Sequence, residues 1–275
     1  IRFQKGEKSN SPALSKLIAT LGDVYVFDAF GVAHRKEAST FGVTSFIDSY
    51  AGLLIEDEIK NINKLVTNLK PPLVTIISGA KVSTKLNLIN SLINKTDYMI
   101  IGGGILNTFL AALNYNIGLS LYEKSFVNEA KEIIKSTNFK KIILPIDVVC
   151  SDDRQLDNPQ NKLISMVQSS DKILDVGKKT LSKYSNIVKN AKTVFWNGPL
   201  GYLEQKPYDF GTIQLSKAIA SANNFSIIGG GDTIPIIEKL GIENDISCLS
   251  TGGGSLLKYI EGEKLPILEK LGNYE

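Results

Sequence analysis

The segment best suited to bind a ligand contains three consecutive glycines followed by an aspartate. Residues 226–235 have the sequence SIIGGGDTIP. The apolar run indicates a buried strand, the glycines allow close backbone approach, and Thr233 and Pro235 indicate the start of a helix. Such a loop binds anions, and Asp232 fits there if a divalent cation lies between its carboxylate and bound phosphates. We therefore expect a magnesium nucleotide, although a tight turn with Asp232 as helix cap fits the same residues.

Two lysines follow another predicted strand. Lys81 and Lys85 lie four residues apart, so they would share one face if a helix has begun there. Two ammonium groups suit the charge of a phosphate, and a solvated helix face is the alternative. Glu204 could accept hydrogen bonds from a ribose or could be an ordinary surface glutamate.

The predicted strands and helices alternate along most of the chain. This alternation predicts an α/β fold with a doubly wound, parallel, six-stranded sheet covered by helices on both faces. Ligands bind at the carboxyl ends of the strands in such sheets. Glycine-bearing loops follow five of the strands, so we expect these loops to meet along one edge. The predicted strands are 73–77, 98–101, 141–144, 193–196, 225–228 and 246–249.

The remaining segments are less regular. Ser11 and Pro12 start a predicted helix that stops before Gly22, and residues 23–27 are predicted to form a strand. Apolar residues spaced by three and four between 55 and 69 predict a long helix that links two domains. The polar stretch 150–175 is predicted to be a hairpin-like insertion.

Composition narrows the classes of protein. The 275 residues are 43% hydrophobic and carry a net charge of +3, which is too small to indicate a nucleic-acid partner. The two cysteines, Cys150 and Cys248, lack metal-site spacing and fit a reducing cytosol. The longest apolar runs have the length of strands, so no membrane span is expected. His34 is the only histidine, which argues against a multi-histidine metal site and favours a structural or solvated role for its ring.

Two common nucleotide motifs are missing. No segment matches the Walker A loop. The dinucleotide fingerprint fails at 102–107, where Asn107 occupies the position of the last glycine. These absences argue against a P-loop enzyme and against a nicotinamide dehydrogenase.

Seven ordered segments of the sequence resemble the motifs of the phosphoglycerate kinase family. The resemblance runs from Arg2 almost to the end of the chain and implies a glycolytic, cytoplasmic transferase. This kinase would move a phosphoryl group between 1,3-bisphosphoglycerate and ADP, giving 3-phosphoglycerate and MgATP. It implies a monomer when complete, with no nucleic-acid or membrane partner. The segments are 22–31 with 33–35, 79–83 with Lys85, 100–104, 144–149, 196–201, 229–233 and 250–254.

The resemblance also implies roles for single residues. Asp232 and Thr233 would hold Mg²⁺ and phosphates, and Glu204 the ribose. Arg2 and Arg35 would bind phosphoglycerate, and Lys85 would contact the nucleotide phosphates. The catalytic group would be Lys81, Arg35, Gly253 and Gly254, and the other nucleotide-binding residues would be Ala80, Gly104, Ile173, Gly198, Leu200, Leu203, Gly230 and Gly231.

The resemblance divides the chain into parts. Residues 1–54 would be the remaining part of an α/β phosphoglycerate-binding domain, 55–70 an interdomain helix, 71–262 the nucleotide domain, and 263–275 a segment returning to the first domain. The family's chain begins well before Arg2, so we expect uncovered apolar surface, with marginal stability or association.

Two residues depart from the family pattern. Ile173 replaces a usual glycine and would narrow the base slot, and Lys178 replaces a usual proline. The activity of this shortened chain stays open at this point. The alternative function is a non-catalytic nucleotide-binding module derived from the same fold.

Overall fold

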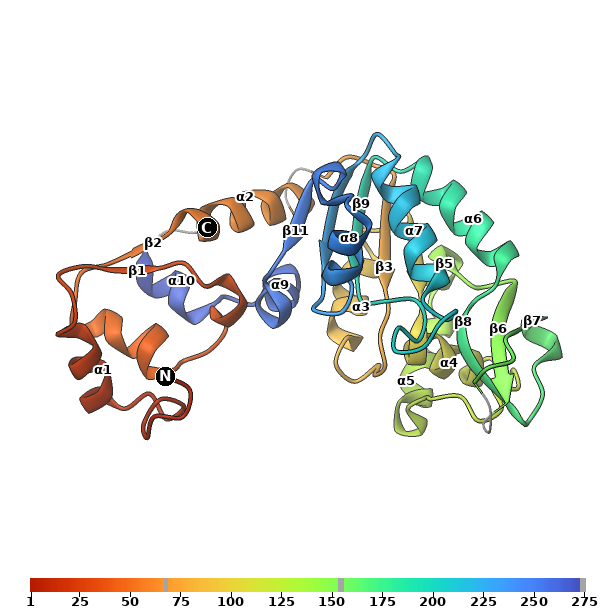
Figure 1. Ribbon diagram of the computed structural model, residues 1–275, viewed down its shortest axis with the longest axis horizontal. Coiled ribbons are helices and arrows are strands. Elements are labelled where there is room, and N and C mark those ends of the chain that lie inside the picture. Colours follow the sequence, from red (N-terminus) through yellow and green to blue (C-terminus); the bar gives the residue numbers. More distant parts are fainter. Residues whose placement is uncertain (67–68, 153–155, 273–275) are drawn as a thin grey trace. The chain divides into compact units, whose positions relative to one another are not determined.

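The computed structural model describes residues 1–66, 69–152 and 156–272, which form two compact units (Figure 1). Unit 1 contains the described residues up to 66 together with those from 250 onward, and unit 2 contains residues 69–249. This division assigns 250–262 to unit 1. The domains expected from the sequence are defined by the ligand that each would bind, so their limits stay a prediction.

Unit 2 is built on a six-stranded, all-parallel sheet, which confirms the predicted α/β fold class. Each predicted strand is present within a few residues of its expected limits. The strand order is β11-β10-β9-β3-β4-β5, with bounds β3 (Leu73–Ile77), β4 (Tyr98–Ile101), β5 (Ile142–Ile143), β9 (Thr193–Asn197), β10 (Phe225–Gly229) and β11 (Cys248–Ser250).

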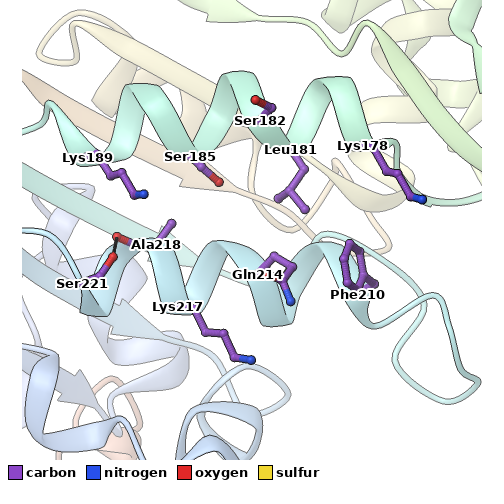
Figure 2. Close-up of a pocket in the computed structure, with 10 residues that line it drawn as sticks. All are labelled: Lys178, Leu181, Ser182, Ser185, Lys189, Phe210, Gln214, Lys217, Ala218 and Ser221. Atoms are coloured by element: carbon purple, nitrogen blue, oxygen red, sulfur yellow. Dashed lines mark hydrogen bonds between the residues drawn. The ribbon is translucent and has the colours of Figure 1, made fainter.

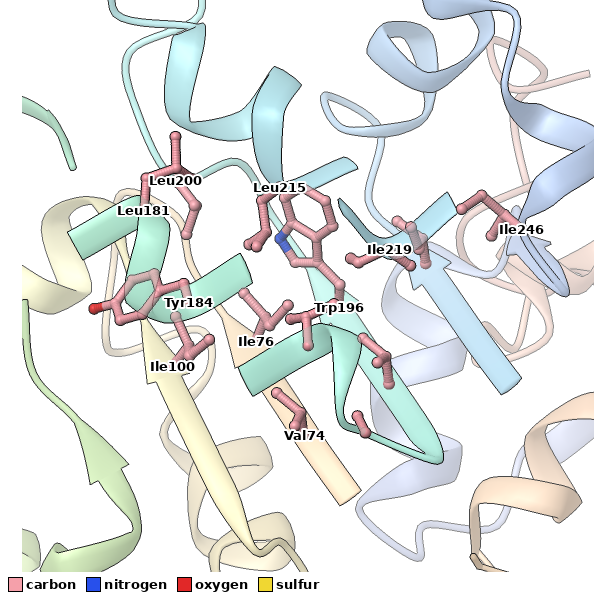
Figure 3. Close-up of a cluster of buried hydrophobic side chains, with 14 of the residues drawn as sticks. Val74, Ile76, Ile100, Leu181, Tyr184, Trp196, Leu200, Leu215, Ile219 and Ile246 are labelled. Atoms are coloured by element: carbon pink, nitrogen blue, oxygen red, sulfur yellow. The ribbon is translucent and has the colours of Figure 1, made fainter. Parts of the chain in front are cut away.

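One hydrophobic core cluster of unit 2 lies between the sheet and helices that include α6 (Lys178–Lys189) and α7 (Phe210–Ala220). Side chains alternate between the two faces of a strand, so Val194 and Trp196 of β9 enter this cluster together. Figure 3 shows Trp196 close to Leu215 of α7. Its indole Nε1 donates a hydrogen bond to the carbonyl of Gly198 at 2.6 Å, which satisfies the polar atom of this buried ring.

Other elements of unit 2 surround this sheet. A three-stranded antiparallel sheet of order β7-β6-β8 forms at the expected insertion, although it begins at Asp147 and residues 153–155 lie outside the described part. Its strands are β6 (Asp147–Asp152), β7 (Gln160–Leu163) and β8 (Asp171–Val176), and the further helices of unit 2 are α3 (Leu86–Ile93), α4 (Gly103–Ala112), α5 (Val127–Lys135) and α8 (Ile234–Leu240).

Unit 1 has two short parallel strands, and its helix α2 begins earlier than predicted. Residue 53 starts α2 because Asp28 Oδ1 accepts the backbone N–H of Ile55 at 3.0 Å, which caps the first turn. The last described residue of α2 is Val66, and 67–68 lie outside the described part. The elements are α1 (Pro12–Ala19), β1 (Tyr25–Phe27), β2 (Ser49–Ala51), α2 (Leu53–Val66), α9 (Gly253–Ile260) and α10 (Pro266–Leu271).

Several apolar side chains on the strands of unit 1 are exposed. Val26 of β1 is 57% exposed, Tyr50 of β2 is 58% exposed, and Leu53 at the start of α2 is 78% exposed. This agrees with the expected uncovered apolar surface, while the expected association stays a prediction. In the part of the chain that the structure describes, no helix has the length and apolar character needed to cross a membrane.

Candidate functional site

Three neighbouring strands of unit 2 end side by side. Ile77 of β3 pairs with Asn197 of β9, and Asn197 pairs with Gly229 of β10. Because the strands are parallel, the loops that follow them leave from the same edge of the sheet. The structure therefore brings the loops that carry Lys85, Gly198 and Asp232 to one edge.

Lys85 occupies a partly buried position at this edge. Its Nζ donates hydrogen bonds to the carbonyl oxygen of Ser78 and, at 3.2 Å, to that of Asn197. Gly198 has a φ of +92°, and a Cβ there would collide with the backbone carbonyl oxygen of Ser78 and lie 2.7 Å from Nζ, so the close approach of these two loops requires a residue without a side chain. Burial lowers the pKa of Lys85 to about 8, and the carboxylate of Asp232 acts in the opposite direction. Lys85 and Asp232 are therefore electrostatic neighbours.

The low pKa of Lys85 predicts that nucleotide binding depends on pH. The ammonium form is present below about pH 8 and is lost above it, and only this form attracts phosphate oxygens. We expect the affinity for ADP to weaken about threefold to tenfold between about pH 7 and about pH 9. Calorimetric titration across this range measures it. Lys85→Met should bind weakly with little pH dependence, and a wild-type affinity that does not change with pH would contradict the assignment.

Lys81 lies elsewhere in the same loop. Helix α3 begins only at Leu86, so Lys81 and Lys85 do not share a helix face. Lys81 is exposed, and its loop is held at Ser83, whose backbone N–H and hydroxyl donate to the carboxylate of Glu123 at 2.8 and 2.7 Å. The side chain of Lys81 is thus exposed and close enough to the carboxylate of Glu123 to interact with it electrostatically, while the backbone of its loop is anchored.

The loop with Asp232 contains an unsatisfied buried group. Thr233 is fully buried, and its Oγ1 has no hydrogen-bond partner among the described residues. Thr233 precedes α8, which has no side-chain cap, so the alternative in which Asp232 caps this helix is not realised. The carboxylate of Asp232 is exposed. A hydroxyl oxygen and a carboxylate oxygen at adjacent positions are ligands that Mg²⁺ accepts.

Backbone contacts join three residues of the predicted adenosine slot. Ala80 and Gly104 approach so closely that a Cβ on Gly104 would collide with the Ala80 carbonyl oxygen. The N–H of Gly103, at the start of α4, donates to the carbonyl of Leu200 at 3.1 Å. Ala80, Gly104 and Leu200 therefore lie together.

A second backbone hydrogen bond positions other residues that are predicted to bind the nucleotide. The Tyr202 N–H donates to the carbonyl of Leu174 at 2.8 Å, which attaches the loop carrying Leu203 and Glu204 to β8 beside Ile173. Ile173 is buried and Glu204 is exposed. Gly230 packs near Gly198, and Gly231 is open on its Cβ side. Lys178 begins α6 normally, so the departure from proline does not prevent the helix.

In unit 1, the two arginines that are predicted to bind phosphoglycerate lie close to the same carboxylate. Arg2 Nη1 lies 2.5 Å and Arg35 Nη1 lies 3.8 Å from the same oxygen, Oε1 of Glu37. Gly253 and Gly254 form the first turn of α9, where a Cβ on Gly254 would lie 3.4 Å from the ring of His34.

Sequence reasoning missed two residues that organise these groups. Glu37 holds both arginines, and Asn197 supplies a carbonyl to Lys85. A polar residue at the end of an otherwise apolar strand was the available signal for Asn197. Nothing in the local sequence distinguishes Glu37 from a surface glutamate.

A groove of about 540 Å³ is lined by residues of α6 and α7 and by Ser221, the residue that ends α7. Figure 2 shows the side chains that line this groove. None of the predicted site residues lines it, so it does not support the nucleotide site. Its lining residues are Lys178, Leu181, Ser182, Ser185, Lys189, Phe210, Gln214, Lys217, Ala218 and Ser221.

An open parallel sheet with glycine-bearing loops and a partly buried lysine at the carboxyl ends of its strands is typical of α/β proteins that bind phosphorylated ligands. The family model described as phosphoglycerate kinase matches residues 1–263. The chain belongs to the phosphoglycerate kinase family.

Individual relatives agree with this family. Phosphoglycerate kinases of Buchnera aphidicola and Blochmanniella floridana are 45% and 44% identical, over 98% and 100% of this chain and 68% of each relative. The structure of the Coxiella burnetii enzyme has a TM-score of 0.88 at 39% identity, covering 98% of this chain and 71% of that one. The crystal structure from Pyrococcus horikoshii has a TM-score of 0.86 at 28% identity, covering 98% and 70%.

These comparisons confirm the predicted family, fold class and activity. The activity is that of an ATP-binding kinase of glycolysis, a phosphotransferase. Nothing in them favours the alternative of a non-catalytic nucleotide-binding module. The roles of single residues stay predictions.

Proposed function

We propose that this chain transfers a phosphoryl group between 1,3-bisphosphoglycerate and ADP, with the nucleotide at the carboxyl edge of the unit 2 sheet. The observation that carries the proposal is the partly buried ammonium of Lys85 beside Asp232, in a space that Gly198 leaves open. Two of its three protons are directed at the carbonyls of Ser78 and Asn197, so one remains for a phosphate oxygen. A partly buried positive charge is costly unless opposite charge offsets it, and a bound phosphate would add to the effect of the Asp232 carboxylate.

The resident cation in this proposal is Mg²⁺, bound together with the nucleotide. Among the described residues, no group of three or more histidine, cysteine, aspartate or glutamate side chains could hold a metal ion. Asp232 and the unpaired Oγ1 of Thr233 fit a cation that takes its other ligands from phosphate oxygens and water. When bound, the cation neutralises phosphate charge.

The transfer step needs positive charge around the moving phosphoryl group rather than an acid or a base. Lys81 is the exposed cation assigned to this group, and the backbone N–H groups of Gly253 and Gly254 at the start of α9 supply further donors. Arg2 and Arg35 bind the carboxylate and phosphate of phosphoglycerate, since guanidinium groups pair with such anions through two hydrogen bonds.

The adenosine part occupies the slot shaped by Ala80, Gly104, Gly198, Leu200 and Leu203. Glu204 binds the ribose, Ile173 narrows the base side, and Gly230 and Gly231 let the backbone approach the phosphates. The proposed functional domains are those expected from the sequence, with 71–262 binding the nucleotide. A cytoplasmic location, and a monomeric state when the chain is complete, belong to the same proposal. The location is supported by cysteines without paired spacing and by the glycolytic family.

Arg35→Ala tests the phosphoglycerate assignment. The variant should raise the KM for 3-phosphoglycerate at least about tenfold, because a charged hydrogen bond to the substrate is lost, and it should leave ADP affinity unchanged. A coupled assay with 3-phosphoglycerate and ATP gives the KM. Lys36→Ala removes a neighbouring positive charge and serves as the matched control. An unchanged KM would refute the role of Arg35, and a folded wild-type chain without turnover would refute the proposed function.

A further inference from the structure

Ser255 connects two segments of unit 1 that are 221 residues apart in sequence. It lies in the first helical turn of α9 and is fully buried. Its Oγ accepts a hydrogen bond from the backbone N–H of His34 at 3.2 Å and lies 2.7 Å from Nδ1 of the same ring. On the other side of the ring, Nε of Arg35 donates a longer hydrogen bond to Nε2 of His34 at 3.5 Å. The three side chains form one chain of contacts.

These contacts are compatible with only one neutral form of the ring. Nε2 can accept from Arg35 only if it carries no proton, which places the proton of the neutral imidazole on Nδ1. Nδ1–H then donates to Ser255, whose oxygen has two lone pairs and can accept both N–H groups of His34. The opposite tautomer would direct two N–H donors at each other.

We propose that Ser255 and His34 are positioning residues for Arg35. The serine fixes the ring with its proton on Nδ1, and the free lone pair of Nε2 then holds Nε of the guanidinium group. Glu37 holds Nη1 of the same group at 3.8 Å, so Arg35 is held at two points and its remaining N–H groups have a defined direction. The proposal rests on the proposed function, because it assumes that Arg35 binds phosphoglycerate.

The charges around His34 agree with a neutral ring. Burial lowers the pKa of His34, the nearby cations Arg35 and Lys258 lower it further, and Glu37 acts in the opposite direction. The contact with Arg35 is therefore present above this lowered pKa. It is lost as the pH falls through that value, because protonation of Nε2 places N–H against N–H and positive charge against positive charge.

The first test uses the wild-type chain and needs no substitution. His34 is the only histidine, so a long-range ¹H–¹⁵N correlation spectrum of the imidazole contains the signals of one ring. We expect the Nδ1–H tautomer at neutral pH. In Ser255→Ala the Nδ1 partner is lost, and the population should shift toward the Nε2–H tautomer. A predominant Nε2–H tautomer in the wild type would overturn the proposal.

The second test measures the consequence for the substrate. Ser255→Ala in the full chain should raise the KM for 3-phosphoglycerate about threefold to tenfold and leave the KM for ATP unchanged, and Ser255→Thr, which keeps the hydroxyl, should restore it. The matched control is Ser216→Ala, which removes another fully buried serine hydroxyl, one that donates a hydrogen bond within α7 to the carbonyl of Thr212.

The outcomes separate this proposal from the proposed function. An equal rise of the KM in Ser216→Ala, or a folded Ser255→Thr variant that behaves like alanine, would overturn the positioning role. An unchanged KM in Arg35→Ala would instead refute the substrate assignment of Arg35, and the tautomer measurement is independent of that result.

Discussion

Lys81→Ala is expected to lower kcat about a hundredfold to a thousandfold while leaving the fold intact. Removing one preorganised group that stabilises developing charge costs about this much in other enzymes. Lys81 is exposed, and its loop is anchored through Ser83 and Glu123 rather than through the lysine itself, so the variant should unfold at the wild-type temperature. The coupled assay measures kcat, and thermal unfolding checks the fold.

Lys95→Ala is the control for Lys81→Ala, since it removes another exposed lysine of unit 2 and should keep full activity. A kcat within about twofold of wild type for Lys81→Ala would remove this residue from the transfer step. Near-complete loss of both kcat and folding would show that the residue acts on structure instead.

Asp232→Asn should weaken binding of MgADP at least about tenfold. Loss of a residue that only hydrogen-bonds to a metal ligand already costs about this much in metal affinity, and Asp232 would be a ligand itself. The same substitution should leave the affinity for metal-free ADP unchanged or raise it, because a negative charge near the phosphates is removed. Calorimetry with and without a chelator measures both affinities. Equal MgADP affinity in variant and wild type would exclude Asp232 as a metal ligand.

The effect of Asp232→Asn can also be measured without a ligand. The carboxylate of Asp232 opposes the effect of burial on Lys85, so the pKa of Lys85 should fall below about 8 in the variant. A titration of the lysine Nζ by NMR measures this shift. An unshifted pKa would show that the two side chains are not coupled.

The strands of the large sheet could be predicted from the sequence because each is a short apolar run between polar turns. Buried parallel strands need no alternation of polar and apolar residues, so runs such as 73–77 and 98–101 are recognisable by themselves. The alternation with helices then predicted that the strands run parallel, and this common direction places the loops that follow the strands at one edge.

Features that depend on distant contacts could not be predicted. Helix α2 begins at Leu53 because Asp28, far earlier in the chain, caps it. Lys85 precedes α3 with a φ of −131°, which is outside the helical range. Its four-residue spacing from Lys81 therefore does not place the two side chains on one helix face. The bond between His34 and Ser255 spans 221 residues, and Ser255 gives no local signal of its partner.

The register that aligns Ile77, Asn197 and Gly229 has an evolutionary consequence. A slip of β9 by one residue would displace Gly198 by about 3.3 Å and turn Trp196 to the opposite face of the sheet. Lys85 would then meet a bulky neighbour, and the interior would lose its largest ring. Mutations that loosen packing here would therefore also impair ligand capture, so selection on either property preserves both.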